Sequence, residues 1–250
     1  MAVDEVLLDL VSRSAGSHLT FLRFYGWKQP TLSIGYSQKM EKVVDFAFCQ
    51  SHGIQVVRRL TGGKAVLHDR ELTYSIISND ADHFPIHDIS RTYQLIAEAL
   101  SSSLTEIGIQ TVLAGSTTRN NSTVRSHAYP QFACFALSNH HEILWKGRKL
   151  IGSAQRRTQR GFLQHGSILI EFDPTLLAGA LGTPQLVKME SDVATLAGCL
   201  GYTPQIAEIL SSFVRGFAGK FQVTFENGVL DQKLRNEIQR RMLTRQKLLD

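Results

Sequence analysis

IQVVRRLTGGKAVLHDRELTYSIIS, residues 54–78, contains two strand-like segments and no helical segment between them. Apolar and β-branched residues predominate at 54–59 and, with one aromatic residue, at 72–78, so a strand is predicted at each end. The intervening residues include Thr61-Gly62-Gly63, which is a turn or loop signal. Because strand follows strand here, the segment indicates sheet formation without a crossover helix.

The rest of the chain extends this pattern. Further strands are predicted at 19–27, 31–36, 109–113 and 162–172, together with a β-hairpin over 141–154 that turns at Lys146-Gly147. Helices are predicted over 3–11, 43–52 and 90–108 and from Pro174 onward, the last one around 234–242. Strict alternation of strand and helix is absent. We therefore expect an α+β fold, with a mixed or antiparallel sheet flanked by helices, and a single domain over 1–250.

Composition narrows the class of protein. With 43% hydrophobic and 20% charged residues among 250, the chain is expected to be ordered around a core. No apolar run approaches the roughly 20 residues that cross a bilayer, and residues 1–10 lack the basic start of a signal peptide, so no membrane association is expected. The three cysteines, Cys49, Cys134 and Cys199, lack metal-type spacing. They favour free thiols in a reducing compartment, the cytoplasm, and no metal site.

The charge of the chain suits an acidic partner. Lysine and arginine number 27 against 22 acidic residues, for a net charge of +5. No helix-turn-helix, zinc finger or aromatic-basic RNA motif is found, so nucleic acid is not expected as a partner. Six basic residues gather in the last 20 positions, and we interpret them as the solvated face of a terminal helix: Lys233, Arg235, Arg240, Arg241, Arg245 and Lys247.

Three segments combine glycine with polar side chains that suit chemistry. Arg58-Arg59 precedes Thr61-Gly62-Gly63, where backbone N–H groups can approach a ligand, although a hairpin turn is the commoner reason for Gly-Gly. Lys149 lies on a strand of apolar and small residues, where alternation places Ile151 and Ser153 on its face. A solvated lysine is slightly favoured by this pattern alone. His165, in Gln164-His165-Gly166-Ser167, is by base rate more often structural than functional.

Cys134 is the candidate nucleophile. It lies in Ala133-Cys134-Phe135-Ala136, after the polar loop 116–130 and before the hairpin that carries Lys149. A thiol and a nearby ammonium can move an acyl group through a thioester. A buried cysteine between phenylalanines is the alternative, and it is the interpretation we prefer for Cys49 and Cys199, which occur in helical apolar settings.

The segments occur in a characteristic order: Arg58-Arg59-x-Thr61-Gly62-Gly63-x-Ala65-Val66-x-His68-Asp69, then Gly147-x-Lys149-x-x-Gly152-Ser153-Ala154-Gln155, then Gln164-His165-Gly166-Ser167. With 22–27 and 31–36, this set resembles the lipoyl/octanoyl transferase and lipoate–protein ligase superfamily over nearly the whole chain. It is most similar to the octanoyltransferases of the Gram-positive type, which act on the glycine cleavage H protein.

This resemblance implies a catalytic domain of the biotin/lipoate protein ligase type that needs no cofactor. It implies transfer of an octanoyl group from octanoyl-acyl carrier protein to the lysine of glycine cleavage H protein or of an E2 lipoyl domain. Cys134 would be the acyl-thioester nucleophile, and Lys149 would lower its pKa. We expect a monomer. The residues expected to bind substrate are Arg59, Thr61, Gly62, Gly63, His68, Gly152, Ser153, Ala154 and His165.

Departures from the ligases favour a transferase. Lys64 stands where ligases usually have a third glycine, His141-Glu142 replaces an Asn-Asp pair, and the remaining length does not fit their accessory domain. The alternatives are an ATP-dependent lipoate–protein ligase, a lipoyl/octanoyl amidotransferase that uses the same cysteine, and an inactive binding module. For the acyl chain, we expect an apolar slot with walls such as Leu67, Tyr74 or Ile151.

Overall fold

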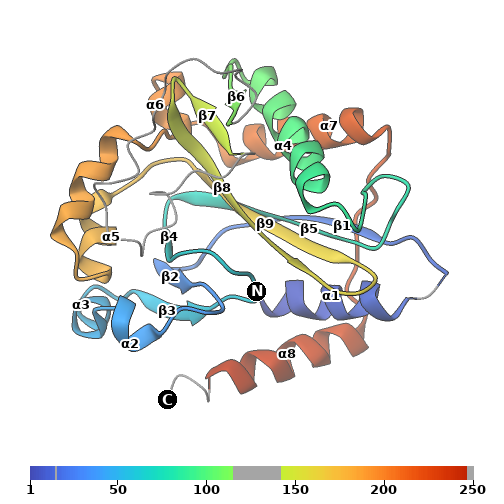
Figure 1. The fold of residues 1–250 in the computed structure, drawn as a ribbon, viewed down its shortest axis with the longest axis horizontal. Coiled ribbons are helices and arrows are strands. Elements are labelled where there is room, and N and C mark those ends of the chain that lie inside the picture. The colour runs from blue at the N-terminus through green and yellow to red at the C-terminus, as the bar shows by residue number, and fades with distance from the viewer. Residues whose placement is uncertain (15, 115–141, 247–250) are drawn as a thin grey trace.

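A computed structural model describes residues 1–14, 16–114 and 142–246, apart from the side chains of residues 189, 245 and 246 (Figure 1). Cys134 and the predicted loop at 116–130 lie outside the described residues. None of the described helices is both long enough and apolar enough to cross a membrane.

Two sheets form the framework, and they confirm the α+β prediction. The larger sheet has the strand order β1 (Thr20–Tyr25), β5 (Glu71–Ser78), β9 (Phe162–Leu169), β8 (Arg148–Arg157), β7 (Ile143–Trp145) and β6 (Val112–Leu113), and every neighbouring pair is antiparallel. The smaller sheet has the order β3 (Gln55–Arg58), β2 (Thr31–Ile34) and β4 (Val66–His68). It is mixed, because β2 pairs parallel to β3 and antiparallel to β4.

Helices cover both faces of the larger sheet (Figure 1). On one face α4 (Ile89–Glu106) and α7 (Ile206–Phe221) pack together and share the main core with β5, β8 and β9. On the other face α1 (Ala2–Arg13) packs on β5 and β9, with α8 (Gln232–Gln246) outside it. Because both faces are covered, all eight residues of β5 are buried.

The remaining helices lie beside the smaller sheet. They are α2 (Met40–Val43), α3 (Phe46–Ser51), α5 (Pro174–Ala180) and a 3₁₀ helix over Pro184–Ser191, while α6 (Leu196–Leu200) packs near the main core. The helix predicted over 43–52 is present as α3, but it begins three residues later than predicted. Val44 and Asp45 are extended, and the Asp45 carboxylate accepts a hydrogen bond of 2.9 Å from the Phe48 N–H, so a new helix begins there.

The Thr61-Gly62-Gly63 segment is a crossing loop and not a hairpin turn. The strands it joins, β3 and β4, are not neighbours, because β2 lies between them. The loop therefore passes over the end of β2, where a Cβ at Gly35 would lie 2.0 Å from the Gly63 carbonyl oxygen. Gly63 has φ +89°, a conformation that favours glycine. Strand β4 was not predicted, since its three residues are too few to show a pattern.

Candidate active site

A small cavity lies where the two sheets meet. Its walls come from β2, the crossing loop, β4, β5, β8 and β9, and are formed by Ser33, Arg59, Val66, His68, Thr73, Gly152, Ser153, Ala154, His165, Gly166 and Ser167. Residues from all three sequence segments therefore meet here, including six of the predicted site residues. Thr61 joins them through a hydrogen bond of 2.7 Å between its Oγ1 and His165 Nε2.

Arg59 organises the crossing loop. Its side chain is buried, and Nη2 donates hydrogen bonds to the carbonyls of Gly62 at 2.9 Å and Lys64 at 2.6 Å. These bonds occupy carbonyl oxygens of the loop. The Gly62 and Gly63 N–H groups, by contrast, donate to no residue in the described part of the chain. The loop can thus present donors to a ligand, as the sequence suggested.

His165 is a buried, uncharged member of the site. It lies on β9, opposite Ser75 of β5 and Ala154 of β8. Burial lowers the pKa of His165 from 6.5 to about 3, with Asp4 opposing the shift and Arg59 adding to it. The imidazole is therefore neutral near pH 7, and it positions Thr61 through their hydrogen bond.

Mild acid is expected to destabilise the protein through His165. Below pH 6.5 the unfolded chain binds a proton at His165 that the folded chain, with a pKa of about 3, does not bind. The free energy of unfolding therefore falls by about 1.4 kcal/mol per pH unit, or about 2 kcal/mol between pH 6.5 and pH 5. Urea unfolding of the wild type and of His165→Gln at pH 7 and pH 5 measures this, and the variant should lose less stability. An equal loss in both proteins would contradict the assignment.

Ser153 and Gly166 form the wall of the cavity next to β8 and β9. The Ser153 Oγ lies 2.7 Å from the Tyr74 hydroxyl, which also accepts a hydrogen bond of 3.1 Å from Gln164 Nε2. A Cβ at Gly166 would lie 2.5 Å from Tyr74 Cε1 and 2.6 Å from the Gly152 carbonyl oxygen. Glycine at 166 is therefore required for the strands to pack this closely.

None of the residues predicted as walls of the acyl slot lines this cavity. Leu67 packs in the core of the smaller sheet, and Tyr74 and Ile151 pack in the main core. Among the described residues, Val66 is the largest apolar side chain that lines the cavity. In the sequence these strand residues all look alike, because both faces of the strands are covered and apolar residues do not reveal which face meets the cavity.

Lys149 is buried in an ion pair that the sequence did not reveal. Its Nζ lies 2.5 Å from Glu142 Oε1, and the two side chains are only 5% and 6% exposed. The favoured interpretation as a solvated lysine is therefore wrong. A register shift between β7 and β8 also breaks the simple alternation that linked Lys149 to Ile151. The Lys149 backbone instead bonds to residues 192 and 194.

Two of the three cysteines can be assessed directly. Cys49 lies in α3 and Cys199 in α6, both as free thiols. Burial raises the pKa of each thiol to about 11, so neither is a ready nucleophile near neutral pH. Cys49 packs in the core beside the smaller sheet and Cys199 packs partly buried against the main core, as the structural interpretation expects.

One group of possible metal ligands occurs away from the cavity. His18, Asp80 and Asp82 bring three ligand atoms within 4.8 Å of one another. His18 and Asp82 are exposed, and such groups are common without an ion, so we assign no metal site there.

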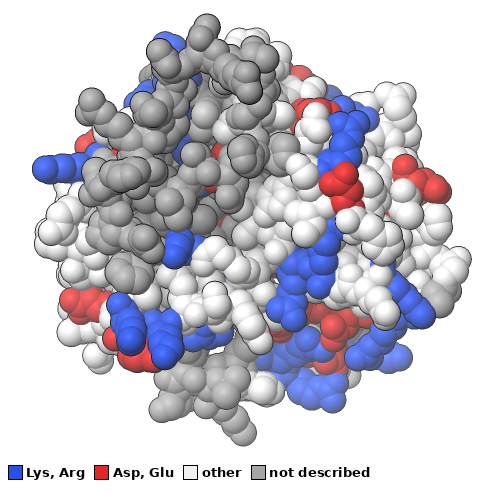
Figure 2. All heavy atoms as spheres, viewed as in Figure 1, with Lys and Arg blue, Asp and Glu red and all other residues white. Residues whose placement is uncertain are grey.

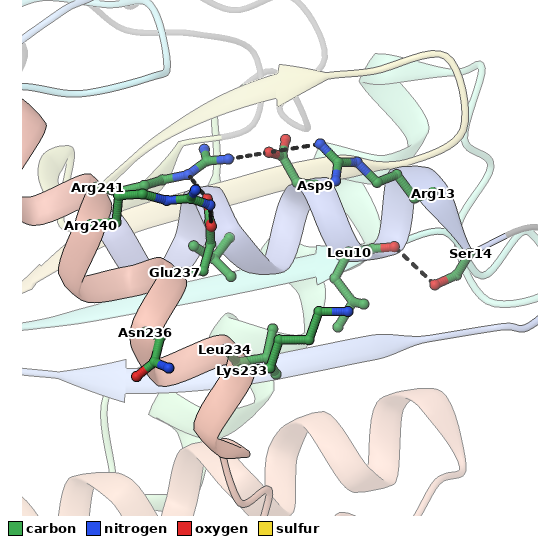
Figure 3. Close-up of a pocket in the computed structure, with 11 residues that line it drawn as sticks. Asp9, Leu10, Arg13, Ser14, Lys233, Leu234, Asn236, Glu237, Arg240 and Arg241 are labelled. Atoms are coloured by element: carbon green, nitrogen blue, oxygen red, sulfur yellow. Dashed lines mark hydrogen bonds and ion pairs between the residues drawn. The ribbon is translucent and has the colours of Figure 1, made fainter.

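A groove of about 890 Å³ lies elsewhere, between α1 and α8 (Figure 3). Its charged side chains largely pair with one another. Arg241 bonds to Asp9 and Glu237, and Arg13 lies 3.9 Å from Asp9. The basic residues of the last helix thus partly neutralise acidic residues of the first, in addition to facing solvent. None of the predicted site residues lines this groove.

The arrangement of the two sheets and their helices is the fold of the lipoate–protein ligases. The structure aligns with a lipoate-protein ligase A bound with ATP (TM-score 0.74, 24% identity, 96% of this chain and 86% of the other). It also aligns with a bipartite lipoate protein ligase from Thermoplasma acidophilum (TM-score 0.75, 23% identity, 96% and 84%). These likenesses establish the fold.

Sequence comparison gives the family. The family model for the lipoyl protein ligase A/B catalytic domain matches residues 1–218. The chain therefore belongs to this family. It is 37% identical to octanoyltransferase LipM of Geobacillus kaustophilus over 90% of this chain and 83% of the relative. It is also 37% identical to octanoyltransferase LipM of Carboxydothermus hydrogenoformans, over 97% and 89%. The chain is therefore an enzyme, an acyltransferase.

Proposed function

We propose that the protein transfers an octanoyl group from octanoyl-acyl carrier protein, through a thioester on Cys134, to a lysine of a lipoyl-type acceptor protein. The observation that carries this proposal is the match, over 90% of the chain or more, to proteins named octanoyltransferase. The convergence of the three sequence segments around one cavity supports it. The acceptor is glycine cleavage H protein or an E2 lipoyl domain, and the product serves lipoate biosynthesis.

The first half-reaction acylates the enzyme. The Cys134 thiolate attacks the carbonyl carbon of the donor thioester, a new C–S bond forms, and the carrier thiolate leaves. Lys149 is the cation that raises the thiolate fraction of Cys134. Exchange of one thioester for another is nearly thermoneutral, so this step needs no ATP and no cofactor. The N–H groups of Gly62 and Gly63 are candidates to stabilise the tetrahedral oxyanion, as are those of Ser153 and Ala154.

The second half-reaction transfers the acyl group to nitrogen. The acceptor lysine attacks octanoyl-Cys134 as a free amine, the C–N bond forms, and the C–S bond breaks. The amine loses one proton, and the Cys134 thiolate departs. An amide is lower in energy than a thioester, which drives the transfer forward.

The surface of the protein suits acidic partners. On the face shown in Figure 2, lysine and arginine side chains form several separate groups, with fewer acidic side chains among them. Acyl carrier proteins and lipoyl domains are typically acidic, and complementary charge speeds their association. We further propose that residues 1–250 act as one catalytic domain, as a monomer, in the cytoplasm, whose reducing conditions fit the free thiols of Cys49 and Cys199.

A donor comparison tests the proposed activity. Enzyme and acceptor are incubated with octanoyl carrier protein, with octanoate plus ATP and magnesium, or with octanoylated H protein. Octanoyl carrier protein is expected to give modified acceptor without ATP. Activity only with octanoate and ATP would establish the ligase alternative, and activity only with octanoylated H protein would establish the amidotransferase. No modification with any donor would favour an inactive binding module.

A further inference from the structure

Ser33, His68 and Glu71 form a buried hydrogen-bonded array at the cavity. The Ser33 Oγ lies 2.8 Å from His68 Nε2, and His68 Nδ1 lies 3.1 Å from Glu71 Oε1. All three side chains are buried, and Ser33 and His68 line the cavity. The Trp27 ring stacks on the imidazole at 4.3 Å and fixes its plane. The array thus connects a hydroxyl in the cavity to a carboxylate behind it.

Groups that can only donate fix the direction of these hydrogen bonds. At one end, Arg59 Nη1 lies 3.2 Å from the Ser33 Oγ and must donate to it. At the other end, the Trp27 indole donates to Thr73 Oγ1 at 2.9 Å, and the Thr73 hydroxyl donates to Glu71 Oε1. Glu71 therefore acts as an acceptor.

The imidazole of His68 then has one consistent arrangement when neutral. His68 Nδ1–H donates to Glu71, and Nε2 accepts the hydrogen of the Ser33 hydroxyl. The basic lone pair of Nε2 thus accepts a hydrogen bond from Ser33, whose hydroxyl lies at the cavity. This is the order of groups that passes a proton from a reacting centre to a histidine oriented by a carboxylate.

The Glu71 carboxylate is placed to stabilise a positive charge on His68. Its Oε2 is buried and bonds to no group in the described part of the chain. A buried carboxylate with an unused oxygen carries a charge that needs a partner. A proton taken up by His68 places a positive charge 3.1 Å from Glu71 Oε1.

Two other titratable groups, His165 in the cavity and Glu142 outside its lining, are less suited to take up a proton. Nε2 of His165 bonds to Thr61, and burial holds the pKa of His165 at about 3, so it does not accept a proton near pH 7. The Glu142 carboxylate already pairs with Lys149 at 2.5 Å. The array at Ser33 is therefore the part of the site built to receive a proton.

We propose that His68, through the Ser33 hydroxyl, takes up the proton that the acceptor lysine loses during acyl transfer. The inference rests on the proposed function. As the C–N bond forms and the C–S bond breaks, the amine proton passes to Ser33 Oγ, and the Ser33 proton passes to His68 Nε2. The Cys134 thiolate leaves, and His68 then releases the proton to solvent before the next turnover. Glu71 is a positioning residue that keeps the imidazole in the required tautomer.

Separate measurement of the two half-reactions distinguishes proton uptake by His68 from a purely structural role of this residue. The wild type and His68→Gln are acylated with octanoyl carrier protein, and acylation and subsequent transfer are timed separately in single turnovers. Acylation needs no proton acceptor of this kind, so its rate is expected to change only a few-fold. Transfer to the acceptor lysine is expected to slow roughly 100-fold. Equal slowing of both steps, or unchanged transfer, would overturn the proposal.

A less basic acceptor gives a second readout. The acceptor lysine is replaced by S-(2-aminoethyl)cysteine, whose amine gives up its proton more readily. The deficit of His68→Gln is expected to shrink several-fold with this acceptor, whereas a structural defect would leave it unchanged. Ser33→Ala and Glu71→Gln should repeat the pattern, and either one replaces His68→Gln if that variant does not fold.

The matched control is Ser103→Ala. It removes a fully buried hydroxyl on α4, which bonds to the Ala99 carbonyl at 2.8 Å and lies outside the cavity lining. Both half-reactions should proceed as in the wild type. If the wild type never becomes acylated, the proposed function itself is refuted. If the variants become acylated and then transfer the octanoyl group at the wild-type rate, only the role of His68 is refuted.

Discussion

Cys134→Ala is expected to abolish the octanoyl adduct on the enzyme. After incubation with octanoyl carrier protein, the intact mass of the wild type should increase by one octanoyl group, and hydroxylamine should remove it. The variant should show no adduct, because alanine has no nucleophile. The loss should be complete, since the other two thiols have pKa values of about 11 and react poorly near neutral pH.

The cysteine variants Cys49→Ser and Cys199→Ser are the matched controls. Each removes a thiol from a helix and leaves Cys134 in place. Both should acylate at the wild-type rate. An adduct that persists in Cys134→Ala, or that disappears in Cys49→Ser or Cys199→Ser, would contradict the assignment of the nucleophile.

Lys149→Met is expected to produce the second-largest effect, on both stability and acylation. The substitution leaves the Glu142 carboxylate buried without the ammonium that lies 2.5 Å away. Breaking a buried pair by removing one partner costs about 3–5 kcal/mol of stability. Acylation should also slow, at least roughly tenfold, because a cysteine without a neighbouring cation is mostly protonated near pH 7. Denaturant unfolding and the single-turnover acylation rate measure the two effects.

The double variant Lys149→Met/Glu142→Gln separates stability from chemistry. It removes both charges, so no uncompensated charge remains buried, and much of the lost stability should return. Acylation should stay slow because the cation is still missing. Recovery of acylation together with stability would show that Lys149 acts through the fold alone.

Local patterns in the sequence predicted much of the fold. The turn at Lys146-Gly147 is confirmed, with φ +48° and +78°, and so is the helix over 90–108, whose buried face includes Ile96, Leu100 and Leu104. These features depend on neighbours within a few positions. The crossing loop at Gly62-Gly63 was not predictable, because a strand from elsewhere in the chain, β2, separates β3 from β4.

The site was predicted through its motif residues and not through their partners. The order of the segments predicted Arg59, His68 and His165 as site residues, and all three line one cavity. Ser33 and Glu142 were missed. Ser33 bonds to His68, which is 35 positions away, and no local pattern encodes that contact. The available signal was a hydroxyl between Leu32 and Ile34 on a strand whose residues are all buried, since buried hydroxyls usually have partners. Glu142 showed no signal beyond its position just before the hairpin.

The most direct test of the account uses isolated octanoyl-enzyme. Acylated wild-type protein is freed of donor, mixed with the acceptor domain in the absence of ATP, and followed by intact mass of both proteins. The account predicts that the octanoyl group leaves the enzyme and appears on the acceptor lysine at the same rate. Two results would contradict the account. The octanoyl thioester on the enzyme could hydrolyse while the acceptor stays unmodified, or the acceptor could be modified only when ATP is added.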